Sequence, residues 1–261
     1  TDYLAEAFEV LQARQQSAQQ QTMQINLALL AHTRQYHLAQ SSDNQDGMLV
    51  ASVCAGTNPI RGDEPELAEL LSAVVTSGQL TASTGFDGLQ DADIITINVD
   101  TPVAPDNRPA YESLKAATES VGRHMRTGSL VIVESTVAPG TTAGLVRRQL
   151  EIASGRQEGS GFFVGVSPER IMPGKALANL RELSRVCGGS CPHVASTMTE
   201  LYRSIGSGDL DTTDLTTAET VKVVENTYRD VQIAFANEIA LMCLELGLDV
   251  WEHAYYKKYG P

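Results

Sequence analysis

The chain has 261 residues and a formal net charge of -13, with 42% hydrophobic and 20% charged residues. This composition is typical of a folded globular chain of one large or two modest domains, and it excludes intrinsic disorder. The acidity disfavours general nucleic-acid binding, because the phosphates are also negative. No apolar run is long enough to cross a bilayer, and the N-terminus lacks a secretory-signal pattern, so we expect a cytoplasmic protein without membrane contact.

The four cysteines indicate reduced thiols rather than a disulfide framework, because a chain of this size needs no covalent staples. Cys187, Cys191 and His193 could be interpreted as part of a metal site. Their spacing matches no strong zinc pattern, however, and a second pair of ligands is missing. We therefore predict no metal.

Residues 1–48 differ in composition from the rest of the chain and form an atypical N-terminal segment. Apolar residues at helical spacing over 4–11 predict an amphipathic helix. A glutamine-rich stretch follows, and the apolar run at 25–31 is compatible with either a strand or a helix. Residues 41–47, SSDNQDG, have the composition of a loop.

Between residues 49 and 210, apolar runs alternate with amphipathic stretches. The apolar runs predict strands at 92–99, 129–136, 162–169 and 184–189. The amphipathic stretches predict helices at 64–77, 111–125, 141–153 and 193–205. Strands that alternate with helices form βαβ units, so we predict an α/β fold with a Rossmann-like parallel sheet flanked by helices.

The first three predicted strands end in polar residues. These residues are Asp100-Thr101, Ser135-Thr136 and Ser167-Pro168-Glu169-Arg170. Ligands of open parallel sheets bind beyond the carboxyl ends of the strands. We therefore expect all three segments to line one crevice.

A long helix is predicted over residues 216–247. Thr216 and Glu219 have the spacing of a capping box at its start, and Gly247 is a natural stop. The helix is apolar around much of its circumference, which is typical of a helix buried between domains or subunits. Asp249 then resembles the cap of a further helix.

Lys222 and Asn226 are four residues apart on this helix, so they share one of its faces. A charge on a mostly apolar helix needs a partner, a ligand or a shifted pKa. This pair is therefore a candidate for chemistry, and a plain surface lysine is the alternative.

Five motifs occur in an order that resembles a known family. They are GDEPELAELL, INVDTPV, VIVESTVAPGTT, SPERIMPGKAL and AETVKVVENTYRDVQIAFANEIALMCLELGLDVWE. This order is similar to that of the nucleotide-sugar 6-dehydrogenases, which include UDP-glucose and UDP-N-acetyl-D-mannosamine dehydrogenases. The segment ENTYRDVQIAFANE most resembles the UDP-N-acetyl-D-mannosamine branch of the family. The resemblance covers residues from about 50 to 255.

The resemblance implies an NAD-binding Rossmann domain, a long central helix that forms a homodimer interface, and a UDP-binding domain beyond it. In that family the C6 alcohol of a UDP-sugar is oxidised twice to a carboxylate. A cysteine holds the intermediate as a thiohemiacetal and then as a thioester. The implied cofactor is NAD and the implied substrate is a UDP-sugar.

The resemblance also assigns roles to five residues. It implies that Thr101, Thr136 and Glu169 lie at the cofactor, and that Glu169 and Thr136 position or activate water. It implies that Lys222 stabilises a developing oxyanion or shuttles a proton, supported by Asn226. Positive charge beside an alkoxide and a partly buried carboxylate base both suit this chemistry.

Three of these residues also have simpler structural interpretations. Thr101 precedes a proline and could be only a turn residue. Thr136 could cap the helix that follows Gly140. Glu169 could be a helix-entry carboxylate balanced by Arg170.

The chain departs from the family pattern at two places. No Gly-x-Gly-x-x-Gly turn for the NAD pyrophosphate occurs in residues 1–60, where the first alignable residues, VASVCAGTNPI, look like a helix end. No Gly-Gly-x-Cys-x-Pro-Lys-Asp segment follows the long helix. We therefore expect residues 49–210 to be an incomplete NAD-binding domain and 211–261 a truncated helical dimerisation region. The chain is then either a partial enzyme or a non-catalytic interaction fragment.

Overall fold

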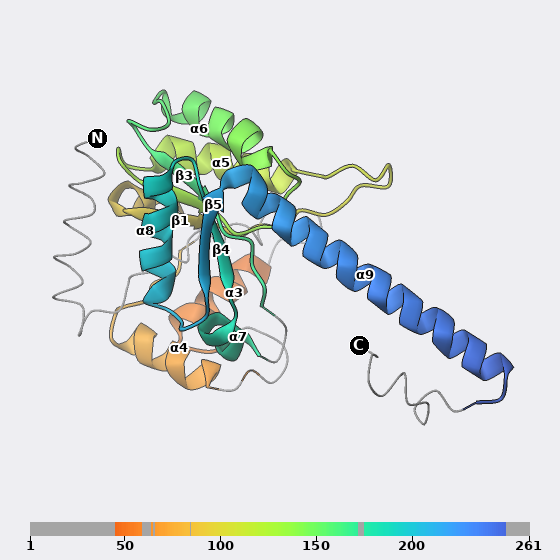
Figure 1. Cartoon of the computed structure of the whole chain (residues 1–261). Coiled ribbons are helices and arrows are strands. Elements are labelled where there is room, and N and C mark those ends of the chain that lie inside the picture. The colour runs from red at the N-terminus through yellow and green to blue at the C-terminus, as the bar shows by residue number, and fades with distance from the viewer. Residues whose placement is uncertain (1–44, 59–63, 65, 84, 172–174, 249–261) are drawn as a thin grey trace. The chain divides into compact units, whose positions relative to one another are not determined.

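The computed structural model describes residues 45–58, 64, 66–83, 85–171 and 175–248 (Figure 1). The helix expected over 4–11 and the helix expected after Asp249 lie outside these residues. The chain divides into two compact units between Glu219 and Thr220. The first unit contains the sheet and its helices, and the second contains most of the long helix.

Within the part of the first unit that the structure describes, the core is a sheet of five strands in chain order, β1 to β5. They are β1 (Ile94–Ile97), β2 (Leu130–Val133), β3 (Phe163–Val166), β4 (Arg185–Gly189) and β5 (Leu210–Asp214). β1, β2 and β3 run parallel, in the register that pairs Val133 with Ile97 and with Val166. The four predicted strands are confirmed.

The sheet is mostly rather than wholly parallel, which corrects the prediction. β4 is antiparallel to β3, and β5 is parallel to β4. Among the described residues between β3 and β4, the short helix α7 (Ala176–Glu182) is the one regular element, and an antiparallel neighbour needs no crossover helix. β5, LDTTD, was not predicted, because it is a largely exposed edge strand without an apolar run. The start of β4 therefore lies at the carboxyl edge of β3.

The predicted helices of the first unit are also confirmed. They are α4 (Leu67–Thr76), α5 (Glu112–His124), α6 (Arg147–Ser154), preceded by the π-helical turn η2 (Thr142–Val146), and α8 (Pro192–Arg203). The helix α7 and the 3-10 turn η1 (Asp87–Asp91) were not predicted, and only the end of the helix α3 (Gln45–Cys54) was inferred from the sequence. α3 shows that the loop expected over 41–47 is wrong from Gln45 onward, whereas the helix end inferred at VASVC is confirmed.

Helices cover both faces of the sheet, as predicted (Figure 1). Successive strand residues face opposite sides of the sheet and so join two different clusters. Val131 and Val133 of β2 pack in the cluster that includes α5 and α6, and Leu130 and Ile132 pack in the cluster that includes α8. Ile132 is fully buried. Burial of each such side chain stabilises the fold by about 1.5–3 kcal/mol. This two-sided core explains why the strands are continuous apolar runs.

The long helix α9 (Leu215–Glu245) is confirmed, but the predicted capping box at its start is wrong. The side chain of Asp214 accepts hydrogen bonds from the backbone N–H of Thr217, at 3.0 Å, and from its hydroxyl, at 2.6 Å. These bonds from Thr217 lower the pKa of Asp214. Glu219, the expected partner in the box, binds a different helix terminus.

In the second unit, α9 carries a stripe of exposed apolar side chains. Its members are Val224, Tyr228, Val231, Phe235 and Met242, each 48–65% exposed. The steps of four, three and four residues from Val224 to Phe235 place them on one side of the helix. The expected burial of α9 between domains or subunits therefore stays a prediction. No helix among the described residues is long and apolar enough to span a membrane.

Candidate functional site

The carboxyl ends of β1 and β2 are joined by side-chain hydrogen bonds. The Thr101 hydroxyl donates to the backbone carbonyl of Thr136, with an O–O distance of 2.6 Å. The buried hydroxyl of Ser135 accepts from the backbone N–H of Val99, at 2.8 Å, and donates to its carbonyl, at 2.7 Å. Thr101 and Thr136 therefore lie side by side at the edge where ligands of such sheets bind, as the sequence predicted.

The described residues fit one half of an NAD site. A dinucleotide-binding sheet has two βαβαβ halves, and the ligand lies where the strand order reverses between them. β1, β2 and β3 follow chain order without reversal, so they form a single half with Thr101 and Thr136 at its edge. The glycine turn of the other half does not occur among the described residues. These residues alone hold no complete pyrophosphate cradle.

The helix that follows β2 is capped by Glu219 and not by Thr136. The carboxylate of Glu219 accepts from the backbone N–H groups of Gly140, at 2.5 Å, and of Thr142, at 2.7 Å. Glu219 is fully buried. A carboxylate at a helix N-terminus accepts hydrogen bonds from otherwise unpaired N–H groups, and its negative charge interacts favourably with the helix dipole. This terminus is therefore already occupied by an anion, which excludes the capping alternative for Thr136 there.

Glu169, just beyond β3, is held by three donors. One carboxylate oxygen accepts from the backbone N–H groups of Arg170, at 2.6 Å, and Ile171, at 2.9 Å. The other accepts from Nη2 of Arg185, at 2.9 Å. The Arg170 guanidinium instead donates to Ser184. The cation that binds Glu169 is therefore Arg185, which corrects the alternative of a pair with Arg170.

Arg185 belongs to a larger charged cluster, defined here as Glu134, Glu169, Arg185 and Tyr202. Nη1 of Arg185 lies 3.5 Å from the carboxylate of Glu134, without hydrogen-bond geometry. The guanidinium carbon lies 4.5 Å from the centre of the Tyr202 ring, and the Tyr202 hydroxyl donates to Glu134 at 2.7 Å. The cluster lies at the carboxyl edge of β2 and β3.

Burial and neighbouring charges shift the pKa values inside this cluster. Burial raises the pKa of Glu134 despite the opposing effects of Tyr202 and Arg185. Burial and the Glu134 carboxylate raise the pKa of Tyr202 well above its ordinary value. Burial alone would lower the pKa of Arg185, but Glu169 and Glu134 raise it. Arg185 is therefore a permanent cation, and burial makes Glu134 resist ionisation.

Three members of the cluster were not identified from the sequence. Arg185 opens a strand and Tyr202 lies near the end of a helix, so neither stands in a recognisable motif. Glu134 directly follows an apolar strand in the motif VIVESTVAPGTT. This strand-end position could have identified Glu134 as a candidate site residue. Only the antiparallel placement of β4 brings Arg185 to the edge that holds Glu134.

Lys222 and Asn226 lie on α9 in the second unit, one helical turn apart. Lys222 is half-buried and Asn226 is exposed. Their expected common face is consistent with the continuous helix. Their roles stay predictions.

Two cysteines of the described residues are buried. Cys187, on β4, has a pKa that burial raises, which disfavours the thiolate needed by a nucleophile or a metal. Cys243, on α9, is 1% exposed. Neither has the surroundings of a catalytic thiol.

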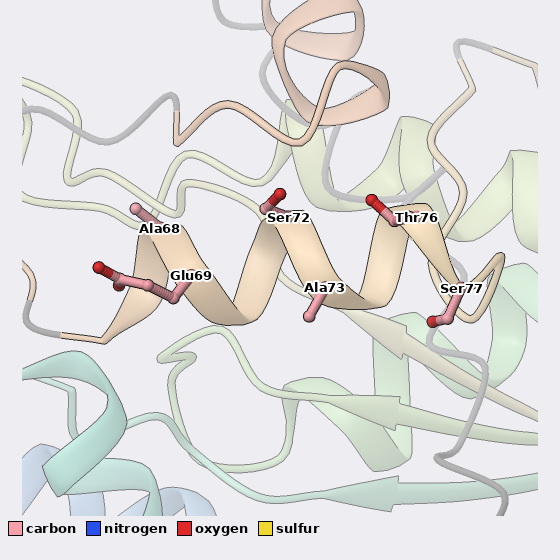
Figure 2. Close-up of a pocket in the computed structure, with 6 residues that line it drawn as sticks. All are labelled: Ala68, Glu69, Ser72, Ala73, Thr76 and Ser77. Carbon is pink, nitrogen blue, oxygen red and sulfur yellow. The ribbon is translucent and has the colours of Figure 1, made fainter.

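A shallow, open hollow lies along α4, away from the residues discussed above. Figure 2 shows its lining, which is Ala68, Glu69, Ser72, Ala73, Thr76 and Ser77. These small side chains offer a single carboxylate and no cation. The hollow includes none of the predicted site residues.

A mostly parallel sheet with its polar groups at the carboxyl edge defines a Rossmann-like α/β protein. Residues 43–206 match the model of the UDP-glucose/GDP-mannose dehydrogenase family, NAD binding domain. Residues 216–257 match the central domain of the same family. The chain belongs to this family of NAD-dependent dehydrogenases, and NAD is the cofactor of the matched domain.

Several relatives act on amino sugars. The chain is 41% identical over 189 residues to UDP-N-acetyl-D-mannosamine dehydrogenase of Pyrococcus horikoshii, covering 72% of this chain and 45% of that protein. It is 36% identical over 195 residues to the enzyme of that name from Escherichia coli K12, covering 72% and 46%. The chain thus spans about half the length of the curated relatives it matches.

Solved structures give the same family. The Pyrococcus horikoshii UDP-D-ManNAc dehydrogenase has a TM-score of 0.74 and 38% identity, covering 78% of this chain and 48% of that one. A ternary complex of GDP-mannose dehydrogenase from Pseudomonas aeruginosa has a TM-score of 0.75 and 25% identity, covering 88% and 55%.

Proposed function

We propose that this chain forms the NAD-binding part and the central helix of a cytoplasmic nucleotide-sugar dehydrogenase that oxidises UDP-N-acetyl-D-mannosamine at C6 to the uronic acid. The observation that carries the proposal is the joined edge of β1 and β2, where the Thr101 hydroxyl binds the Thr136 carbonyl. The identity of 41% and 36% to two UDP-N-acetyl-D-mannosamine dehydrogenases supports the choice of sugar.

The domain boundaries in this proposal follow the composition of the chain. Residues 1–48 are an atypical N-terminal segment, 49–210 the NAD-binding domain, and 211–261 the central helical region. The matches over 43–206 and 216–257 support this division.

In this proposal Thr101 and Thr136 bind NAD, which supplies the hydride acceptor when bound. Glu169 orients water or accepts a proton, because its carboxylate is fixed and 22% of its side chain remains exposed. Lys222 offers positive charge to a developing oxyanion, and Asn226 supports it through a position one turn away. These roles are carried over from the family resemblance.

The 261 residues by themselves do not complete the oxidation in this proposal. The thioester step needs an activated thiol. Cys187 and Cys243 are buried, and none of the four cysteines stands in the complete Gly-Gly-x-Cys-x-Pro-Lys-Asp segment that the resemblance assigns to the reactive thiol. A chimera tests the function directly. Residues 43–257 of this chain replace the matching part of the Pyrococcus horikoshii enzyme, and NADH formation is followed by absorbance.

We expect the chimera to form NADH from UDP-N-acetyl-D-mannosamine at least about tenfold faster than from UDP-glucose, which is the discrimination that one or two polar contacts provide. The unmodified chain should form none. A chimera that is folded and binds NAD but oxidises neither sugar contradicts the proposed function. If the unmodified chain forms NADH from a UDP-sugar, the inference that it lacks the thiol for the thioester step is wrong.

A second function of another class is a homodimer or interaction fragment assembled through α9. The exposed stripe from Val224 to Met242 favours it, because contiguous apolar surface marks association sites. Light scattering during size exclusion distinguishes the two functions. A dimer that does not respond to NAD supports the interaction fragment, and a monomer that binds NAD supports the cofactor domain alone.

A further inference from the structure

The guanidinium of Arg185 lies between two carboxylates at the carboxyl edge of the sheet. Its only hydrogen bond to a carboxylate, among the described residues, goes from Nη2 to Glu169, at 2.9 Å. The pair with Glu134 is longer, at 3.5 Å, and is not a hydrogen bond. Arg185 therefore binds Glu169 more specifically than it binds Glu134.

The position of Glu169 is determined at both of its oxygens. Arg185 occupies one oxygen, and the backbone N–H groups of Arg170 and Ile171 occupy the other. The backbone N–H of Glu169 also donates to the carbonyl of Glu134, at 3.0 Å. With the backbone fixed and both oxygens bound, the carboxylate keeps one orientation as long as Arg185 stays in place.

Arg185 is held by Glu169 in the plane of its guanidinium and by the Tyr202 ring, which stacks on the guanidinium face at 4.5 Å. The ring is fixed in turn, because the Tyr202 hydroxyl donates to the carboxylate of Glu134. A planar guanidinium suits this arrangement, because it can stack on a ring and donate in its own plane at the same time. Lysine could do neither as well.

The exposure of the three charged side chains follows an order. Arg185 is 9% exposed, Glu134 is 14% exposed and Glu169 is 22% exposed. Burial of charge is costly, and a purely structural cluster is often replaced by apolar residues without loss of stability. The most exposed member is the one with the most fixed carboxylate, at the edge where ligands bind.

We propose that Arg185 is a positioning residue for Glu169, and that the Tyr202 ring holds Arg185 in the orientation this requires. The inference deepens the proposed function and rests on it only for the role of Glu169 toward water or a proton. The link between the two side chains is a property of the folded chain alone.

Amide hydrogen exchange of the full chain, followed by NMR without ligands, tests this link. The reporters are the N–H groups of Arg170 and Ile171, which donate to Glu169. We expect Arg185→Gln to accelerate their exchange about tenfold or more, whereas the amides of Val131 and Val164 in the sheet change less than about twofold. Arg185→Lys should recover part of the protection. Arg203→Gln, which removes an exposed arginine paired with Glu200, is the matched control and should change nothing.

Two tyrosine variants examine the second part of the proposal. Tyr202→Phe keeps the ring and should leave both reporter amides within about twofold of the wild type, and Tyr202→Leu should accelerate them about tenfold. If Arg185→Gln does not fold, Arg185→Lys decides by the same reporters. Unchanged reporters in a folded Arg185 variant, or equal acceleration of all amides, would overturn the proposal.

The catalytic consequence is measured separately in the chimera. Arg185→Lys should lower kcat about tenfold and raise the KM for NAD by a clearly smaller factor, because the positioned carboxylate lies at the cofactor but acts chiefly on the reacting atoms. If the reporter amides respond but kcat does not change, the role assigned to Glu169 is wrong and the link between Arg185 and Glu169 stands.

Discussion

The helix α9 has two parts, one up to Glu219 and one beyond it. Both parts have the same helical geometry, but they differ in what stabilises them. In the first turn, Leu215 and Ala218 pack into the core of the sheet, and Glu219 caps the helix after β2. Beyond Glu219, Tyr228 and Phe235 are 65% and 51% exposed. The helix is continuous, so the sequence pattern of a helix does not reveal which part is anchored.

Apolar content and burial are therefore separate quantities along α9. The anchored turn is short and contains a buried carboxylate, whereas the longer part exposes apolar side chains. Exposed apolar surface of this kind is stabilised by association, and a buried carboxylate is stabilised by its own hydrogen bonds.

Removal of the anchor should have the largest effect. Glu219→Ala leaves the N–H groups of the half-buried Gly140 and the buried Thr142 without their acceptor, so we expect a loss of about 3 kcal/mol in the free energy of unfolding. Urea titration followed by circular dichroism measures it. Glu200→Gln, at an exposed ion pair with Arg203, is the control and should change stability by less than about 1 kcal/mol. Equal effects of the two variants would show that Glu219 anchors nothing.

A methyl group inserted beneath the first turn of α9, at Gly188, should have the next largest effect on stability. A Cβ atom at Gly188 would lie 2.7 Å from the Cβ of Ala218 and 2.8 Å from the carbonyl oxygen of Asp214. The second contact is with backbone, which cannot move aside cheaply. Gly188→Ala should cost about 1–3 kcal/mol in thermal or urea unfolding. Gly144→Ala, where a Cβ would meet nothing within 4 Å, is the control.

The exposed stripe should respond in association and not in folding. The double variant Tyr228→Ser and Val231→Ser should weaken self-association about tenfold, or about 1.4 kcal/mol. Its monomer should unfold within about 0.5 kcal/mol of the wild type, since surface substitutions cost little. Sedimentation equilibrium and urea titration measure the two quantities. A monomeric wild type, or a large loss of monomer stability, would contradict the contrast.

The smallest effect concerns pH. Because the folded chain raises the pKa of Glu134, it holds a proton that the unfolded chain releases. The contribution of Glu134 to stability is therefore largest below its ordinary pKa of 4.5 and is lost as the pH rises through the folded value. Glu134→Gln should remove this component, so the wild-type advantage should shrink from pH 4.5 towards neutrality. A difference that grows with pH would contradict the assignment.

The sequence predicted most of the sheet because its central strands are covered on both faces. β2, LVIV, is fully buried, and such runs are recognisable without tertiary information. β5 is polar and half exposed, so its pairing with β4 depends on the neighbouring strand and not on its own composition. The direction of β4 was missed for a related reason, since an apolar run carries no sign of its orientation.

The candidate site was predicted in part. Thr101 and Thr136 were expected to share an edge, and their hydrogen bond confirms that placement. The binding partners of Glu169 and Glu219 were not predictable, because Arg185 is 16 residues away in one case and Gly140 is 79 residues away in the other. Local rules identify a helix cap or a strand end, but they do not identify which distant group a charge will bind.

Calorimetric titration of the 261-residue chain with NAD measures whether the edge of β1 and β2 binds the cofactor. We expect binding with a Kd on the order of 10 μM, weakened about tenfold by Thr101→Val combined with Thr136→Val. Thr227→Val, on the exposed part of α9, should bind as the wild type does. A folded chain that releases no binding heat and gains no thermal stability with millimolar NAD would contradict the account.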